Sequence, residues 1–239
     1  MTKTKMLVVG ITMNCAGTEK SFLSFLSALD FERFDVTLLL AKKKGLLMDQ
    51  LPPQVNVVVM EKYGDMFLLS GRNAAKTLTG CFVKENPLTL FEIFPYFVGS
   101  ALTRGARRAS IATKMWLHFM KKMPEIKEEY DVAVAYWGDR TMFYMCDKVK
   151  ARKKIAWLHF DYANPPRDDD IYRAYFEKCD RVVTVSKPID ESLKAHLPDI
   201  APRCVMMENI TNPKQIWDLA LRGDTFPDTH FTGKRILTI

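Results

Sequence analysis

The feature that most constrains this chain is a regular alternation of short apolar segments with helix-like stretches. The apolar segments are residues 6–9, 36–41, 55–60, 131–136, 154–158, 181–185 and 203–207. Helical spacing is clearest in residues 19–29, where Phe22, Leu26 and Leu29 fall on one side. Residues 65–130 are less regular and mostly helical in pattern. Strands that alternate with helices form a parallel sheet covered on both faces. The sequence therefore predicts an α/β, Rossmann-like, doubly wound parallel sheet.

Composition changes after this alternating region. Residues 211–233 are more polar and contain two prolines and two glycines, with a short predicted helix at 214–221. Residues 234–239 resemble the start of another buried strand, which needs neighbours on both sides. We therefore expect a first domain at 1–210, an interdomain linker at 211–233, and the first strand of a second domain at 234–239.

Charge and cysteine content limit the functional class. The formal net charge is +7, which favours nucleic acid, anionic lipid or phosphorylated substrates as partners. Five scattered cysteines, with no CxxC pair, favour reduced thiols in a cytoplasm over a disulfide framework. The sequence has no apolar run of about twenty residues, the length that would span a membrane. We expect a cytoplasmic protein.

Ligands of an open parallel sheet collect at the carboxyl ends of its strands. After the first predicted strand, Gly17 would let the backbone approach a ligand, and the helix that starts near Thr18 and Glu19 would offer free N–H groups to an anion. The alternative is an ordinary helix start in which Glu19 favours the helix N-terminus. A GxGxxG pattern is lacking, so we expect no nicotinamide or flavin cofactor.

Two other strand ends carry charged or titratable groups. Asp139 is a candidate helix N-cap, and Arg140 in the first turn could reach a phosphate or carboxylate. His159 could point into the cleft, with Asp161 near enough to fix its tautomer. A structural histidine is the alternative.

Further along the chain, Ser186 suits an N-cap before Pro188, and Asn209 lies where the first domain is expected to end. The four histidines are far apart in the sequence, and there is no Walker loop or GxSxG elbow. We expect no metal site.

The middle of the chain interleaves aromatic and basic residues on predicted helices. Such a pattern suits the surface of an anionic membrane, and the alternative is a helix with an apolar packed face and a solvated cationic face. The residues are Tyr96, Phe97, Arg104, Arg107, Arg108, Lys114, Trp116, Phe119, Lys121 and Lys122.

Taken in order, the strand-end motifs resemble the N-terminal half of the GT-B glycosyltransferases of family 4. Residues 16–19 (Ala-Gly-Thr-Glu) are similar to the family's Gly-Gly-x-Glu loop, with Ala16 in place of the first glycine. Residues 131–136 and 155–161 match in order and spacing, and residues 180–186 resemble its D-x-V-x-x-V-S strand. Residues 208–210 resemble its crossing point between domains, and residues 235–239 resemble the strand that opens its nucleotide-sugar domain.

The resemblance implies a retaining transfer of sugar from a nucleotide-diphosphate sugar to a polysaccharide or lipid-linked acceptor, without a metal. It implies that Gly17, Thr18 and Glu19 approach the donor phosphate and acceptor, and that His159 faces the transferred sugar as the catalytic residue. Ser186 would help to line the cleft, and Arg140, Asp161 and Asn209 complete the set of candidate substrate-binding residues. The family's donor-binding basic pair and Glu-x7-Glu motif have no counterpart in residues 1–239, so residues 1–239 alone are expected to be inactive.

Three other functions compete with this one. A nucleotide-sugar epimerase would use the same fold. A nucleic-acid-binding module would explain the positive charge, but no helix-turn-helix, RNP or zinc-finger motif is present, so we expect no nucleic-acid partner. A membrane-docked domain without activity is the third alternative. Our expected partners are a nucleotide sugar, a glycan or lipid-linked acceptor, and an anionic surface on the cytoplasmic face of a membrane.

Overall fold

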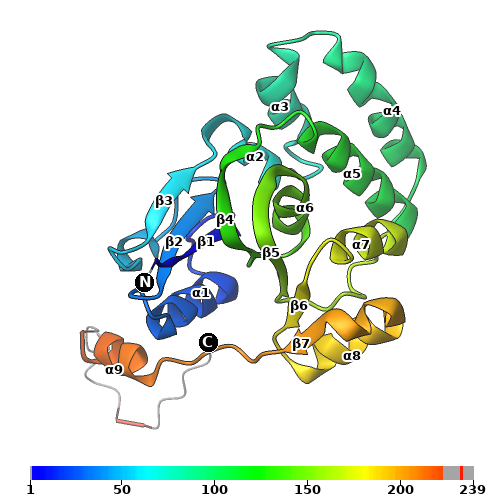
Figure 1. The fold of residues 1–239 in the computed structure, drawn as a ribbon. Helices are drawn as coiled ribbons and strands as arrows, with labels where there is room; N and C mark the ends of the chain where they lie inside the picture. Colours follow the sequence, from blue (N-terminus) through cyan, green and yellow to red (C-terminus); the bar gives the residue numbers. More distant parts are fainter. Residues whose placement is uncertain (1, 223–231, 234–239) are drawn as a thin grey trace.

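A computed structural model describes residues 2–222 and 232–233 of the chain (Figure 1). Seven strands form one sheet in the order β3-β2-β1-β4-β5-β6-β7, and every neighbouring pair is parallel. The strands are β1 (Thr4–Gly10), β2 (Phe34–Leu40), β3 (Asn56–Val59), β4 (Ile126–Ala135), β5 (Val149–Leu158), β6 (Arg181–Thr184) and β7 (Cys204–Met206). The prediction of a doubly wound parallel sheet is confirmed.

Helices make the connections. They are α1 (Gly17–Ala28), α2 (Gly64–Phe67), α3 (Ala74–Leu78), α4 (Thr89–Leu102), α5 (Gly105–Met120), α6 (Asp139–Lys148), α7 (Asp169–Phe176), α8 (Lys187–His196) and α9 (Pro213–Arg222). Short turns of other helix types are η1 (Met48–Gln50), η2 (Glu61–Tyr63), η3 (Thr79–Val83) and η4 (Pro198–Arg203).

Side chains of the central strands divide between two cores because successive residues of a strand point to opposite faces. On one face, Val8, Val134 and Trp157 pack with Phe22 of α1. On the other face, strand residues such as Val9 pack with the helices of residues 65–130 and with α6, α7 and α8. The near-continuous apolar runs of the central strands follow from this two-sided burial.

Each of the seven predicted strand segments overlaps an observed strand, but β4 and β5 begin earlier than predicted. Their pairing starts at Ile126 and Val149 and continues through Lys150 and Lys153, which are polar. A search for apolar runs misses this part because only the second half of each strand is fully covered. The predicted strand at 234–239 lies outside the described residues.

Helices α4 and α5 form an antiparallel pair beside the body of the domain (Figure 1). The Glu92 carboxylate of α4 accepts hydrogen bonds from His118 Nε2 at 2.5 Å and Lys122 Nζ at 2.6 Å. Trp116 and Phe119 face the core and are 1% and 0% exposed. Our prediction that these two aromatic residues lie on a membrane-facing surface is therefore wrong, since α5 uses them to pack against the domain.

The loop after β1 is held by the loop after β2. Met13 N donates to Lys44 O at 2.9 Å, and Leu47 N donates to Met13 O at 3.0 Å. Between these bonds Gly45 has φ +132°, and a Cβ there would lie 1.9 Å from Met13 O. Only glycine fits this position, for both conformational and steric reasons.

A glycine-to-alanine pair tests this loop. We expect G45A to lower the free energy of unfolding by about 3 kcal/mol or more, because strain and a backbone clash combine. The control G17A should stay within about 1 kcal/mol of wild type, since a Cβ at Gly17 meets nothing within 4 Å. Urea unfolding measures both. Equal stability of G45A and wild type would contradict the packing described.

Candidate functional site

The order of strands reverses between β1 and β4, so the chain leaves these neighbours in opposite directions. In doubly wound sheets, the connections after two such strands diverge and leave a crevice at the carboxyl edge. Here the two connections are residues 11–16 after β1 and residues 136–138 after β4. The candidate site is built around this point.

The connection after β1 ends in the first turn of α1. No side chain caps this helix at Ala16, so its first N–H groups have no side-chain partner in the described part of the chain. Gly17 is exposed and Thr18 is partly exposed, with open space around Gly17. Glu19 is buried, and its carboxylate accepts a long hydrogen bond of 3.4 Å from Trp137 Nε1. The start of α1 can therefore offer backbone amides to an anionic group.

A chain of hydrogen bonds connects α1 with β4 and with the segment after β7. Tyr136 OH and Ser21 Oγ lie 2.7 Å apart, and Ser21 Oγ donates to Asn209 Oδ1 at 2.7 Å. Ser21 must then accept from Tyr136, because its one proton goes to Asn209. Burial raises the pKa of Tyr136 to about 12, so the phenol keeps its proton at neutral pH.

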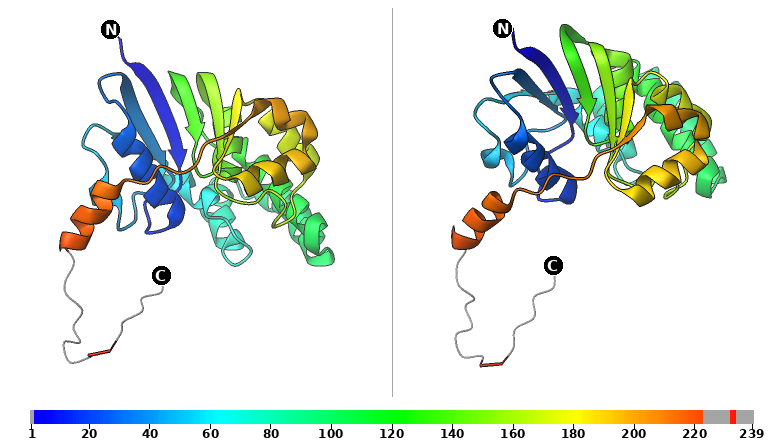
Figure 2. Two further views of the ribbon diagram at one scale, coloured as in Figure 1. Left: turned by 90° about the horizontal axis from the view of Figure 1, so that it is seen from below. Right: turned by 60° about the horizontal axis from the view of Figure 1, so that its bottom comes forward.

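The segment after β7 returns across the carboxyl edge to reach α1 (Figure 2). Beside Asn209 it makes a second bond, from Asn212 Nδ2 to Ser27 Oγ at 2.9 Å. A hollow of about 590 Å³ lies between α1, residues 47–50 and this segment, with Gly17, Lys20 and Asn209 among its lining residues. The predicted residues Gly17 and Asn209 therefore share one hollow.

His159 follows β5 and packs against the ring of Tyr136, with ring centroids 4.7 Å apart. Its Nε2 atom is buried and has no hydrogen-bond partner in the described residues. Burial lowers the pKa of His159 from 6.5 to about 4, so the ring is neutral at pH 7. A neutral ring with an unused nitrogen can bind a ligand hydroxyl. The contacts link His159 to α1 through Tyr136 and Ser21.

Asp161 does not fix the His159 tautomer as we expected. Its carboxylate accepts from Ser192 Oγ at 2.5 Å and from Ala163 N at 3.0 Å. These bonds lower the Asp161 pKa. Asp161 is thus joined to α8, because the chain turns away from the cleft after His159. Ser186 occupies the predicted N-cap position of α8, but its side chain makes no capping hydrogen bond.

Arg140 lies apart from the other candidates, on the opposite face of the sheet. Its Nη1 donates to Phe67 O at 2.9 Å and to Met66 O at 3.4 Å. The expected N-cap role of Asp139 is wrong. Gly138 holds the N-cap position with φ +63°, while the Asp139 carboxylate accepts from Tyr172 OH at 2.8 Å.

The sequence reading missed Ser21 and Tyr136 as site residues. Ser21 is four residues after Gly17, which places it on the same side of α1 as the open first turn. Tyr136 is the last residue of the predicted apolar segment 131–136, and the hydroxyl at that strand end is the one signal for it. Ser21 directly precedes the apolar helix positions that begin at Phe22, and its spacing from Gly17 is the one signal for it.

The described residues also include the cysteines and the other groups that could bind a metal. All five cysteines are free thiols. Among the described residues, no group of three or more acidic, histidine or cysteine side chains could hold a metal ion. No helix among the same residues is both long and apolar enough to cross a membrane.

Comparison with known proteins gives distant structural matches only. No protein-family model matches the chain, and no curated protein matches it. Crystal structures of Anabaena Alr3699/HepE with UDP and glucose, and with UDP-glucose, match with a TM-score of 0.44 at 10% and 11% identity. The structure of TcCGT1 in complex with UDP matches with a TM-score of 0.36 at 14% identity. The matches cover 92%, 92% and 90% of this chain and 50%, 49% and 55% of the others.

The chain thus spans about half the length of these proteins. Similarity of this degree is too distant to assign a family, and the fold rests on the strand order and register described above.

We call the hydrogen-bonded residues Tyr136, Ser21 and Asn209 the hydroxyl chain. Its role in stability can be tested by removing the hydroxyl of its central member, Ser21. S21A should lower the free energy of unfolding by about 1–3 kcal/mol, because it leaves the buried Tyr136 hydroxyl without its partner. S24A, on the same helix, is the control, since the Ser24 hydroxyl makes no hydrogen bond within the described part of the chain. Chemical denaturation of both variants measures the two free energies of unfolding. An S21A variant as stable as S24A would contradict the arrangement.

Burial of neutral His159 also predicts a pH dependence. The unfolded chain takes up a proton near pH 6.5, whereas folded His159 resists protonation until about pH 4. The free energy of unfolding should therefore fall as pH falls through this window, by at most about 1.4 kcal/mol per pH unit from this group. H159F should make the dependence shallower. The control S24A, which removes no titratable group, should keep the wild-type slope, and identical slopes for H159F and wild type would refute the assignment.

Proposed function

We propose that this chain is the acceptor-binding half of a retaining GT-B glycosyltransferase similar to family 4. The enzyme would move a sugar from a nucleotide-diphosphate sugar to a polysaccharide or lipid-linked acceptor. Donor contacts would come mainly from a second domain that follows residues 211–233. The resemblance of the strand-end motifs suggests this class.

One observation carries the proposal. An open helix N-terminus and a neutral histidine with an unused nitrogen are joined through Tyr136 and Ser21 at the reversal of strand order. Glycosyl transfer from a nucleotide sugar requires stabilisation of a departing diphosphate and orientation of a nearly uncharged sugar. Backbone amides suit the first task and a neutral imidazole suits the second.

Each residue then has a role. Amides at Gly17 and Thr18 would approach the donor phosphate and the acceptor, and His159 Nε2 would bind a hydroxyl of the transferred sugar. Asn209 would hold the crossing segment against α1, where the two domains meet. Ser186 would line the cleft after β6. This mechanism uses no metal and no organic cofactor.

Exposed apolar side chains after β6 support a second domain. Val205, Met206, Met207 and Ile210 are each 38–48% exposed along β7 and the segment that follows. A further domain packed against this side would cover them and complete the cleft, which is common for ligand sites.

The remaining parts of the proposal concern location. We place the protein in the cytoplasm, bound peripherally to an anionic membrane surface where a lipid-linked acceptor would be available. Nucleic acid is not a proposed partner. The competing function is nucleotide-sugar epimerisation, which would change the donor in the absence of any acceptor.

Activity of a longer protein that continues through the proposed second domain tests the function. It should transfer sugar from one of a panel of nucleotide sugars to a membrane-lipid extract, while residues 1–239 alone should not, because half a cleft cannot hold both substrates in one geometry. Comparable transfer by residues 1–239 would contradict the two-domain proposal. Conversion of the nucleotide sugar without an acceptor would favour the epimerase.

Within the longer protein, H159A should reduce kcat by about 100-fold or more while the folded structure is retained, because the histidine acts on the reacting sugar. H196A is the matched control and should keep wild-type turnover. Mass spectrometry of the glycosylated product gives the rates. Wild-type turnover in H159A would remove His159 from the proposed site.

A further inference from the structure

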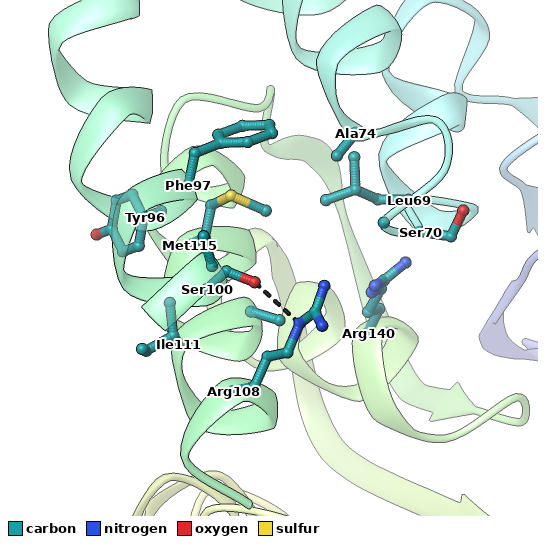
Figure 3. A pocket seen from close by; sticks show the side chains of 13 residues that line it. Leu69, Ser70, Ala74, Tyr96, Phe97, Ser100, Arg108, Ile111, Met115 and Arg140 are labelled. Carbon is teal, nitrogen blue, oxygen red and sulfur yellow. Dashed lines mark hydrogen bonds between the residues drawn. The ribbon is translucent and has the colours of Figure 1, made fainter. Parts of the chain in front are cut away.

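A second cavity lies between the α4–α5 pair, the loop before α3 and the start of α6 (Figure 3). Its volume is about 360 Å³, and its walls are mostly apolar, with Leu69, Phe97 and Met115 among them. Arg108 and Arg140 both line it, and no acidic side chain of the described residues does. The cavity belongs to neither the hydroxyl chain nor the hollow beside α1.

The two guanidinium groups keep unused donors. Among the described residues, Arg140 donates only from Nη1, to two backbone carbonyls, and Arg108 donates from Nε to Ser100 Oγ at 3.2 Å. A guanidinium has five N–H donors, so several remain at each group. Among the described residues, neither arginine forms a salt bridge. Burial lowers the pKa of Arg140, while the neighbouring Asp139 carboxylate acts in the opposite direction.

An exposed apolar face of α4 continues from this cavity. Its residues recur at helical spacing and are Leu90 (54% exposed), Phe91 (78%), Phe94 (69%), Phe97 (40%), Val98 (40%) and Leu102 (81%). We call these six residues the α4 apolar face. Phe97 belongs both to this face and to the cavity wall. Arg104 and Arg107 lie exposed at the adjoining end of the pair.

An occupant must therefore combine a compact anion with an apolar body. Two guanidinium groups match the oxygens of a phosphate, which can accept several charge-assisted hydrogen bonds. Polar side chains on the cavity wall, beyond the arginines, are Ser70, Ser100 and Tyr96, which leaves little to recognise a larger polar head group. The α4 apolar face, with basic residues beside it, has the composition of a helix that lies in an anionic membrane interface.

We propose that this cavity binds the terminal phosphate of a membrane lipid while the α4 apolar face enters the same leaflet. The ligand class is a lipid phosphomonoester, for which phosphatidic acid is the probe. The inference rests on the membrane-bound location in the proposed function and adds the lipid and the residues. It is tested without a sugar donor, so failure of sugar transfer would leave it standing.

Flotation with vesicles tests the cavity. Vesicles of phosphatidylcholine contain either phosphatidic acid or phosphatidylglycerol, adjusted to equal surface charge. Wild-type protein should bind the phosphatidic acid vesicles at least tenfold more tightly. R108Q should remove this preference. The matched control is R107Q, because Arg107 is exposed like Arg108 but does not line the cavity. R107Q should weaken binding to both kinds of vesicle by about fivefold and keep the preference.

Variants of Arg140 in the cavity and of Phe94 on the α4 apolar face complete the test. R140Q should also remove the preference, and circular dichroism checks its fold because Arg140 bonds the end of α2. F94S should weaken binding to both kinds of vesicle, since it removes an inserted ring without touching the cavity.

Three results would overturn the proposal. One is equal binding of wild-type protein to both kinds of vesicle, and a second is an R108Q variant that keeps the preference. The third is binding of soluble glycerol 3-phosphate, dependent on Arg108, as tight as binding of the lipid, which would identify a soluble phosphate ester as the ligand.

Discussion

The parallel pairing of β1 with β4 is the constraint on which the rest of this structure depends. Met6 pairs with Val132 and Val9 with Ala135, although more than a hundred residues separate the two strands. This pairing reverses the strand order and forces the chain to leave β1 and β4 in opposite directions. It also brings Tyr136 within hydrogen-bond distance of Ser21, so the candidate site is a direct consequence of the topology.

Aromatic packing keeps the titratable side chains uncharged at the carboxyl edge of the sheet, beside β1 and β4. Tyr136 packs against Phe22, Trp137, Trp157 and His159 at ring-centroid distances of 4.7–5.6 Å. Such a cluster excludes water and keeps the imidazole and phenol neutral. Neutral donors and acceptors in a dry environment suit hydroxyl-rich ligands, whereas the charge-binding groups lie at the start of α1 and in the second cavity.

Much of the fold could be predicted from the sequence, because buried parallel strands leave apolar runs that a pattern search detects. The strand-end loops could be located for the same reason. The direction of individual side chains could not be predicted, since it depends on contacts far along the chain. Asp161 turned toward Ser192 of α8, and Trp116 turned inward to donate to Met66 O at 2.8 Å. Neither partner is recognisable from local spacing.

The turn at residues 136–140 connects the two candidate binding regions. Tyr136 faces α1, whereas Arg140, four residues later, lines the cavity on the other face. Gly138 makes this change of direction possible with φ +63°, and a Cβ there would lie 2.6 Å from the Phe160 ring. Arg167 stacks on Phe160 at 4.2 Å and reaches the Asp139 carboxylate at 3.4 Å, which fixes the turn from outside. This one turn therefore places the two candidate binding regions on opposite faces of the sheet within five residues of the chain.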